Sequence, residues 1–305
     1  MSNLRGIDRS KLTPQFEAKS AGRVLILDGD GPAYRVAATC KRLDTAIRRY
    51  QQDMLTQLFL TGSESVRIHL TASGSNKAGR YRVIGVKPYQ GNRTNKDKPS
   101  LLEPLREAIA NRENWLDEFD SVFMHRIVEA DDGMMQDAYY YGERGVVWSD
   151  DKDLRMTPFP YWDMEKGVII PTQTVGSIEL GYTPSGTPKL KGHGPLFFWA
   201  QMLMGDTADH IQGVLRYQGK TCGAVGAFNA LGTCSTIAEA ANLVIDAYRS
   251  INQNPMPEGW LLWLLRNETD NFWKYLGEIT LSEANRAYIN ECVTRNWFNN
   301  EHEAA

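Results

Sequence analysis

Residues 23–34, RVLILDGDGPAY, constrain the fold more than any other stretch of the chain. The apolar residues run together without alternation, give way to Asp28 and Asp30, and stop at Gly31 and Pro32. A short apolar run of this kind is typical of a strand buried on both faces of an α/β sheet. Because residues i and i+2 of an extended chain point the same way, the two carboxylates can face one point at the strand end.

Strand-like and helix-like segments alternate through the first half of the chain. The further strand candidates are SVRIHLTAS (65–73), DSVFMHRI (120–127) and GVVWSDDKDL (145–154). The helix candidates are residues 33–60, 101–114 and 131–142. This alternation predicts an α/β fold with a mainly parallel sheet, in which functional groups gather at the carboxyl ends of strands.

The pattern changes after residue 166. Residues 167–194 carry Thr, Gly and Pro in the manner of a β-hairpin, and from Leu196 onward nearly every segment reads as helix. We therefore predict a boundary near Pro195. The two expected parts are residues 1–195, with a hairpin insert at about 167–194, and a helical part at 196–305.

Charge and cysteine content narrow the class of protein. With 34 Lys and Arg against 37 Asp and Glu, the net charge is −3, so a nucleic-acid surface would have to be a local patch. The cysteines are widely spaced and form no CxxC pair, which argues against structural zinc and fits a reducing compartment. The most apolar helix candidate, GWLLWLLR, is too short to span a bilayer. We expect a soluble cytoplasmic protein without membrane contact.

Acidic residues stand at the end of an apolar strand or the start of a helix in four places. They are Asp28 and Asp30; Glu129, Asp131 and Asp132; Asp150, Asp151 and Asp153; and Asp206 and Asp209. If folding brings them together, their pKa values rise and they oppose folding unless cations neutralise them. Oxygen-only ligands suit Mg²⁺ or Mn²⁺. The chemistry expected of such a site is phosphoryl hydrolysis with two ions ~3.5–4 Å apart.

Two other interpretations use the same residues. A single Asp at a strand end or helix start is commonly a cap or turn former, so Asp131 and Asp132 could cap their helix and Asp150 could form a turn. LILDGDG and MGDTAD also resemble motifs of the haloacid-dehalogenase phosphatases, which would make Asp28 a nucleophile and Asp30 its acid. Against the phosphatase, the segment before Gly205 has helical character, and VEADD and SDDKD are left without a role.

Basic residues and tyrosines crowd the segment after the second strand. Within fewer than twenty positions stand Arg80, Tyr81, Arg82, Lys87, Tyr89, Arg93, Lys96 and Lys98. Positive charge interleaved with stacking side chains favours a single-stranded nucleic acid. A solvated loop would look similar.

Five segments, LDGD, YQGNR, VEADD, SDDKD and MGDTADHIQGV, together resemble the flap-endonuclease-like 5′ nucleases. The likeness is strongest to the phage 5′→3′ exonucleases and extends to the 5′ nuclease domain of bacterial DNA polymerase I. It implies a PIN-like α/β domain with a mainly parallel central sheet, a basic arch (about 80–118) over the active site, and a C-terminal helix-three-turn-helix module that holds duplex DNA.

The resemblance also implies which residues act. The metal-site acids would be Asp28, Glu129, Asp131, Asp132, Asp151, Asp153, Asp206 and Asp209, holding two Mg²⁺ or Mn²⁺ ions. In the arch, Arg93 and Lys87 would steady the scissile phosphate, and a K⁺ ion would sit at the helix-three-turn-helix module. The expected DNA contacts are Arg80, Arg82, Lys87, Tyr89, Gln90, Arg93, Lys96, Gly213, Arg216, Gly219 and Lys220.

The sequence departs from the family pattern in three places. Thr71, Ala72 and Ser73 occupy the position where relatives carry a further Asp, which would weaken one metal position or shift it to water ligands. Gln90 replaces an arch lysine, and Lys87, three residues earlier, would take its place on one face of a helix. RYQG stands where relatives often show Gly-Ile-Gly, so the resemblance does not specify how the C-terminal module contacts DNA.

These features together predict a Mg²⁺-dependent 5′→3′ exonuclease with flap endonuclease activity. It would hydrolyse phosphodiester bonds of DNA, or of RNA primers, during phage replication or recombination. Its partner would be double-stranded DNA with a free 5′ end or flap, and the chain would act as a monomer. The alternative in another class is a catalytically weakened, structure-specific DNA-binding protein, which the departures near Ala72 and at Gln90 would also suit.

Overall fold

A six-stranded sheet forms the centre of the computed structural model, which describes residues 17–92, 97–113, 115 and 121–299. The strand order is β3-β2-β1-β4-β5-β6, with β6 antiparallel to β5 and the other neighbours parallel. The strands are β1 (Val24–Asp28), β2 (Ser65–Thr71), β3 (Ser121–His125), β4 (Gly145–Trp148), β5 (Tyr161–Asp163) and β6 (Val168–Ile170). The predicted α/β fold with a mainly parallel sheet is confirmed.

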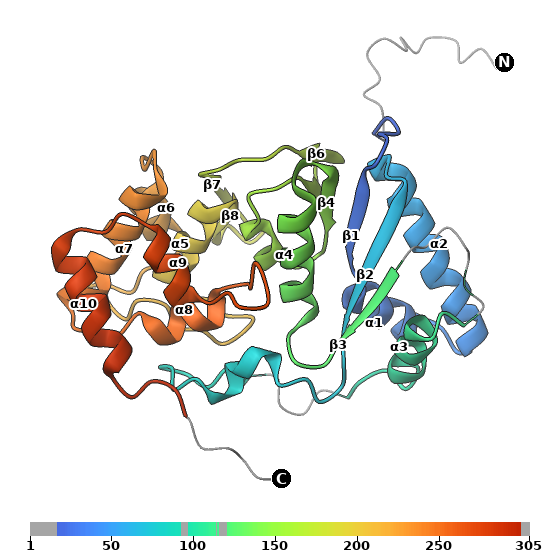
Figure 1. The fold of residues 1–305 in the computed structure, drawn as a ribbon, viewed down its shortest axis with the longest axis horizontal. Coiled ribbons are helices and arrows are strands. Elements are labelled where there is room, and N and C mark those ends of the chain that lie inside the picture. The colour runs from blue at the N-terminus through green and yellow to red at the C-terminus, as the bar shows by residue number, and fades with distance from the viewer. Residues whose placement is uncertain (1–16, 93–96, 114, 116–120, 300–305) are drawn as a thin grey trace.

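Strand β1 is buried along its whole length, as its unbroken apolar run predicts. Leu25 and Leu27 belong to one core and Ile26 to the other, because alternate side chains of a strand point to opposite faces. Three helices pack together on the first face and α4 covers the second (Figure 1). These helices are α1 (Asp30–Thr39), α2 (Leu43–Thr61), α3 (Leu102–Ala110) and α4 (Ala130–Tyr141).

Helices also make up most of the chain after residue 194 (Figure 1). They are α5 (Pro195–Met204), α6 (Ala224–Leu231), α7 (Ile237–Ser250), α8 (Met256–Leu262), α9 (Phe272–Glu278) and α10 (Glu283–Thr294). Pro195 is the first residue of α5, a position where the fixed backbone angle of proline suits a helix. The core of Met134 and Val147 continues into this part through Phe198. The boundary near Pro195 stays a prediction, because the two parts share a core.

Two predicted elements differ from the structure in extent. Residues 33–60 form two helices, with a break after Cys40 that no Gly or Pro marks. The expected hairpin is shorter than 167–194: it consists of β7 (Ser177–Tyr182) and β8 (Pro188–His193), which pair antiparallel. Residues 168–170 instead form β6 at the edge of the main sheet, after a turn that the Asp163 carboxylate caps.

Only part of the range expected to form a basic arch, about 80–118, lies outside the hydrophobic core. It begins in a short 3-10 helix, η2 (Lys77–Arg82), and continues irregularly to Asn92. Farther along, α3 buries Leu102, Leu105 and Ile109 against α1 and α2. This part of the range therefore belongs to the helical layer.

Two further 3-10 helices are η3 (Gly142–Arg144) and η4 (Lys152–Met156). Within the described ranges no helix combines the length and apolar character that crossing a membrane requires.

Candidate active site

Acidic side chains from three segments meet at one cavity beside the carboxyl end of the sheet. They come from the end of β1, the start of α4 and the loop after β4, segments far apart in the sequence. The cavity has a volume of about 760 Å³. Its acidic lining residues are Asp28, Asp30, Glu129, Asp131, Asp150 and Asp151. The parallel sheet thus brings together carboxylates that the sequence places at strand ends.

Asp28 ends β1 and is held by several donors. The backbone N–H of Asp30 donates to Oδ1 at 2.9 Å, and the Ser149 hydroxyl donates to Oδ2 at 2.8 Å. Burial, followed by the charge of Asp30, raises the pKa of Asp28 to about 6. Ser149 also accepts the N–H of Asp151 at 2.9 Å, so one hydroxyl links the ends of β1 and β4. Ser149 was not among the predicted site residues, although it directly precedes the acids of SDDKD.

Asp131 lies in the first turn of α4 and faces the same cavity. Among the residues that the structure describes, no N–H or O–H donates to its carboxylate. Burial, and then the charges of Asp151 and Asp28, raise its pKa well above the usual value. A carboxylate without donors among other carboxylates suits a metal ligand better than a helix cap.

The helix cap is formed by Glu129 and Asp132 instead. Their side chains and backbone N–H groups make a reciprocal capping box at the start of α4. Asp132 is fully buried, and its two oxygens accept from the Arg80 guanidinium at 2.7 and 2.8 Å. Arg80 also donates to Glu129 Oε2 at 3.1 Å and to the Trp263 carbonyl at 2.8 Å. In this arrangement Asp132 is the partner of an arginine, and its role as a metal ligand stays a prediction.

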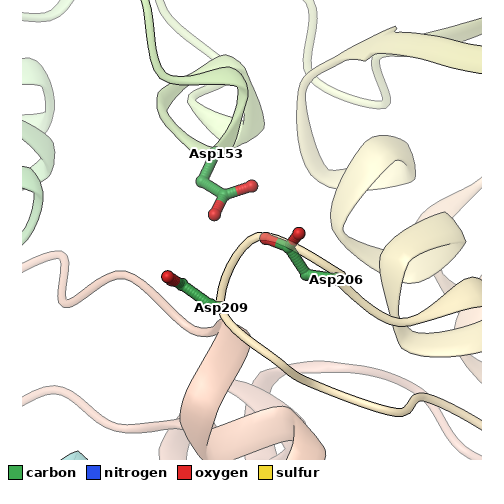
Figure 2. A group of neighbouring side chains, drawn as sticks. All are labelled: Asp153, Asp206 and Asp209. Atoms are coloured by element: carbon green, nitrogen blue, oxygen red, sulfur yellow. The ribbon is translucent and has the colours of Figure 1, made fainter. Parts of the chain in front are cut away.

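Three further acids form a second group close by, which Figure 2 shows. One oxygen each of Asp153, Asp206 and Asp209 lies within 4.8 Å of the others, so they could share an ion. Asp153 comes from η4, and Asp206 directly follows the positive-φ Gly205 that ends α5. Burial, and then the charge of Asp151, raise the pKa of Asp153 to about 7.

The end of β2 carries no acid of its own. Thr71, Ala72 and Ser73, which stand where the family resemblance implied a further Asp, line the cavity. The Thr71 N–H donates to Asp30 Oδ2 at 3.0 Å, while Arg106 on α3 donates to Asp30 Oδ1 at 2.8 Å. Asp30 therefore brings a carboxylate to this strand end, and Arg106 partly neutralises it.

The segment with the expected DNA contacts is irregular, and many of its side chains are already paired. Arg80 is only 2% exposed, so its guanidinium is not accessible to a DNA strand in this conformation. Gln90 accepts from Lys77 at 2.7 Å and lies against the Tyr89 hydroxyl at 3.1 Å. Arg82 is exposed and donates to the Asn299 carbonyl at 2.8 Å.

No contact in the structure tests the predicted DNA-binding roles of Lys87, Arg93 and Lys96. Lys87 is half-buried in the irregular segment, so the helical face it was expected to share with Gln90 does not form. Arg93 and Lys96 lie outside the described residues. The roles of all three stay predictions.

The predicted C-terminal DNA contacts fall into two groups. Gly213 is buried, and a side chain there would collide with Gly205, so this glycine shapes the turn. Arg216, Gly219 and Lys220 are exposed in the loop before α6. A cavity of about 720 Å³ lies along this loop and the start of α6. The loop is open enough to receive a ligand, and its role stays a prediction.

The residues present fit a hard divalent cation. The ligand atoms are carboxylate oxygens, which belong to buried or half-buried residues except at Asp150 and Asp151 in the exposed loop after β4. Burial, and then repulsion from a neighbouring carboxylate, raise the pKa values of Asp28 and Asp153. An added cation would relieve this repulsion. Mg²⁺ and Mn²⁺ prefer such oxygen ligands.

Divalent ions should raise the melting temperature, and more at pH 8 than at pH 5. The pKa values of Asp28 and Asp153 are about 6 and about 7 in the folded chain, above the ~3.9 of an unfolded Asp. The folded state therefore binds protons more tightly at these two carboxyl groups, so their contribution to metal-free stability falls as pH rises from about 4 to about 7. Thermal unfolding with EDTA and with Mg²⁺ across this range measures the effect. A melting temperature that Mg²⁺ leaves unchanged at pH 8 would contradict it.

Comparison with known proteins identifies the fold. Neither the family models nor the curated proteins include a match to this chain. Among solved structures, a bacteriophage T5 protein co-crystallised with metal ions is 14% identical, with a TM-score of 0.51 over 89% of this chain and 98% of that one. The bacteriophage T5 flap endonuclease, in a pseudo-enzyme–product complex with DNA and metal ions, is 13% identical with the same TM-score and coverage. The chain therefore has the 5′ nuclease fold, as the sequence resemblance implied.

Proposed function

We propose that this chain is a divalent-metal-dependent nuclease that hydrolyses phosphodiester bonds of DNA at or near a 5′ end. The observation that carries the proposal is the convergence of Asp28, Asp131 and Asp151 on one cavity, from the ends of two strands and the start of α4. The T5 flap endonuclease of the same fold was crystallised with DNA and metal ions, which supports this choice of substrate.

The side chains of the cavity would have different roles in metal binding and phosphate binding. Asp28, Asp131 and Asp151 would hold the ion, with Ser149 fixing the orientation of Asp28. A bound Mg²⁺ or Mn²⁺ would lower the pKa of an attacking water and stabilise the charge on the leaving oxygen. Lys77 and Arg106 also line the cavity, where they pair with Glu129 and Asp30, and would approach a bound phosphate from there.

The path of the DNA is part of the proposal. Duplex DNA would lie along the loop of Arg216 and Lys220, and a single-stranded 5′ end would reach the cavity past the basic segment after η2. Phosphate contacts release counterions, so DNA affinity should fall steeply with salt concentration. Arg93, with Lys87, remains our choice for the contact to the scissile phosphate.

A cleavage assay tests the function. Flap, nicked, blunt and single-stranded DNA with a 5′ label would be incubated with the chain and Mg²⁺, Mn²⁺ or EDTA. We expect short 5′ products from the substrates with a duplex and an accessible 5′ end, and none with EDTA. The product lengths separate exonuclease from endonuclease action. If neither ion supports cleavage of any of the four substrates, the chain is not a nuclease of this kind.

One observation favours a second candidate, a structure-specific DNA-binding protein with weakened catalysis. The neutral residues Thr71, Ala72 and Ser73 at the end of β2 leave one side of the cavity without a carboxylate of its own. Tight binding of flap DNA without cleavage would favour this alternative. The phosphatase interpretation fits less well, because residues before Gly205 form α5 and not a strand. Adding p-nitrophenyl phosphate to the assay tests it directly.

A further inference from the structure

Lys152 occupies an unusual position within the second acidic group. It lies between Asp151 and Asp153 in the sequence and begins η4. Its Nζ atom is 2.7 Å from Asp153 Oδ1 and also 2.7 Å from Asp206 Oδ2. These are two of the three neighbouring carboxylates that Figure 2 labels. A cationic group of the chain itself therefore bridges the acids that could share an ion.

The bridge is more than an exposed surface ion pair. Asp206 is 3% exposed, and within the described ranges no other Lys or Arg pairs with either Asp153 or Asp206. The Lys152 ammonium group therefore stands between two carboxylates that have no other cationic partner in the described part of the chain.

The Lys152 ammonium group and a divalent ion would compete for the position between Asp153 and Asp206. Mg²⁺ requires its oxygen ligands at about 2.0–2.1 Å, so an ion shared by Asp153 and Asp206 would lie between them, where Nζ now lies. Lys152 would have to withdraw, and its hydrogen bonds to two carboxylates would be lost. The cavity of Asp28 and Asp131 contains no such bridging lysine between those two residues among the described contacts.

We propose that Lys152 serves as a tethered cation for Asp153, Asp206 and Asp209. The chain then takes one divalent ion tightly at Asp28, Asp131 and Asp151, and a second one only by displacing the ammonium group. Lys152 thus sets the metal stoichiometry of the site. The inference deepens the proposed function and rests on it for the consequence in catalysis, but metal binding can be measured without DNA.

The test is a Mn²⁺ titration of the full chain at pH 7.5 without DNA, with free Mn²⁺ followed by electron paramagnetic resonance. The wild type should bind one ion tightly and a second at least about tenfold more weakly, the factor for the loss of roughly one charged hydrogen bond. In Lys152→Met, the second ion should bind at least about tenfold more tightly than in the wild type. Equal affinity of both ions in the wild type, unchanged in the variant, would overturn the proposal.

Two controls make the result specific. Lys166→Met removes another lysine, with a side chain 62% exposed and an ion pair of 3.9 Å, and should leave the titration unchanged. Lys152→Arg keeps the charge and should keep the second ion weak. If Lys152→Met does not fold, the wild-type stoichiometry and the Arg variant still decide. Absence of any Mn²⁺ binding by the folded wild type would contradict the metal-dependent function itself, whereas two equal sites would contradict only the role of Lys152.

Discussion

Replacing Asp131 with asparagine should abolish DNA cleavage while leaving DNA binding intact. The change keeps the size of the side chain and the first turn of α4 but removes a charged ligand from the cavity. A metal ion contributes several kcal/mol to such a reaction, and each ~1.4 kcal/mol is a factor of ten in rate. We expect a loss of about 10³-fold or more in single-turnover cleavage of a 5′ flap substrate.

The same substitution should raise the stability of the metal-free chain, although it abolishes cleavage. Burial, and then Asp151 and Asp28, raise the pKa of Asp131, so its charged form is unfavourable in the folded chain. A neutral amide removes this repulsion. The metal-free variant should therefore melt at a higher temperature than the wild type at pH 8, and Mg²⁺ should stabilise it less. A structural role for Asp131 would instead predict a lower melting temperature.

Two measurements separate catalysis from binding in this variant. Fluorescence polarisation with the same flap DNA in EDTA should give a dissociation constant close to that of the wild type. Asp246→Asn is a matched control, because Asp246 is exposed on α7 and, among the residues that the structure describes, forms an ion pair only with Arg249, at 2.7 Å. It should cleave normally. Unchanged turnover in Asp131→Asn would remove the proposed mechanism.

Local sequence signals predicted the elements that place the acids. The buried β1 follows from an apolar run that lacks alternation, and α4 follows from acids at its start and Gly142 at its end. The break between α1 and α2 was missed because no Gly or Pro marks it. There the geometry is decided by packing of the two helices on the sheet, a long-range effect that local patterns do not report.

The direction of individual side chains was harder to predict than the position of the site. Arg80 and Arg82 are two residues apart in a basic segment, yet one is buried and the other exposed. The burial of Arg80 depends on Asp132 and on the carbonyl of Trp263, which is 183 residues away in the chain. An irregular segment has no periodicity, so its sequence does not show which charges turn inward. The bridging position of Lys152 was not predicted for a related reason. A lysine between acidic residues is expected to be a solvent-exposed side chain, and the sequence does not show that it turns toward Asp206.

Arg80→Met should destabilise the chain more than any other substitution in the basic segment. The guanidinium is 2% exposed and bonds both oxygens of the fully buried Asp132. Removing one member of a buried ion pair leaves the other charge unpaired, which costs about 3–5 kcal/mol. We expect the melting temperature to fall by on the order of 10 °C, measured by circular dichroism. Arg82→Met, in an exposed neighbour, should change it by only a few degrees.

The double variant Arg80→Met, Asp132→Asn distinguishes the two possible roles of Arg80. If Arg80 acts by neutralising Asp132, removing that charge as well should recover part of the lost stability, because no buried carboxylate is left unpaired. If Arg80 is instead a DNA contact, as its place in a basic segment suggests, the single variant should keep its melting temperature and bind DNA with a smaller salt dependence. A stable Arg80→Met variant with weakened DNA affinity would therefore mean that the ion pair with Asp132 adds little to the stability of the free chain and that the guanidinium contributes to DNA binding.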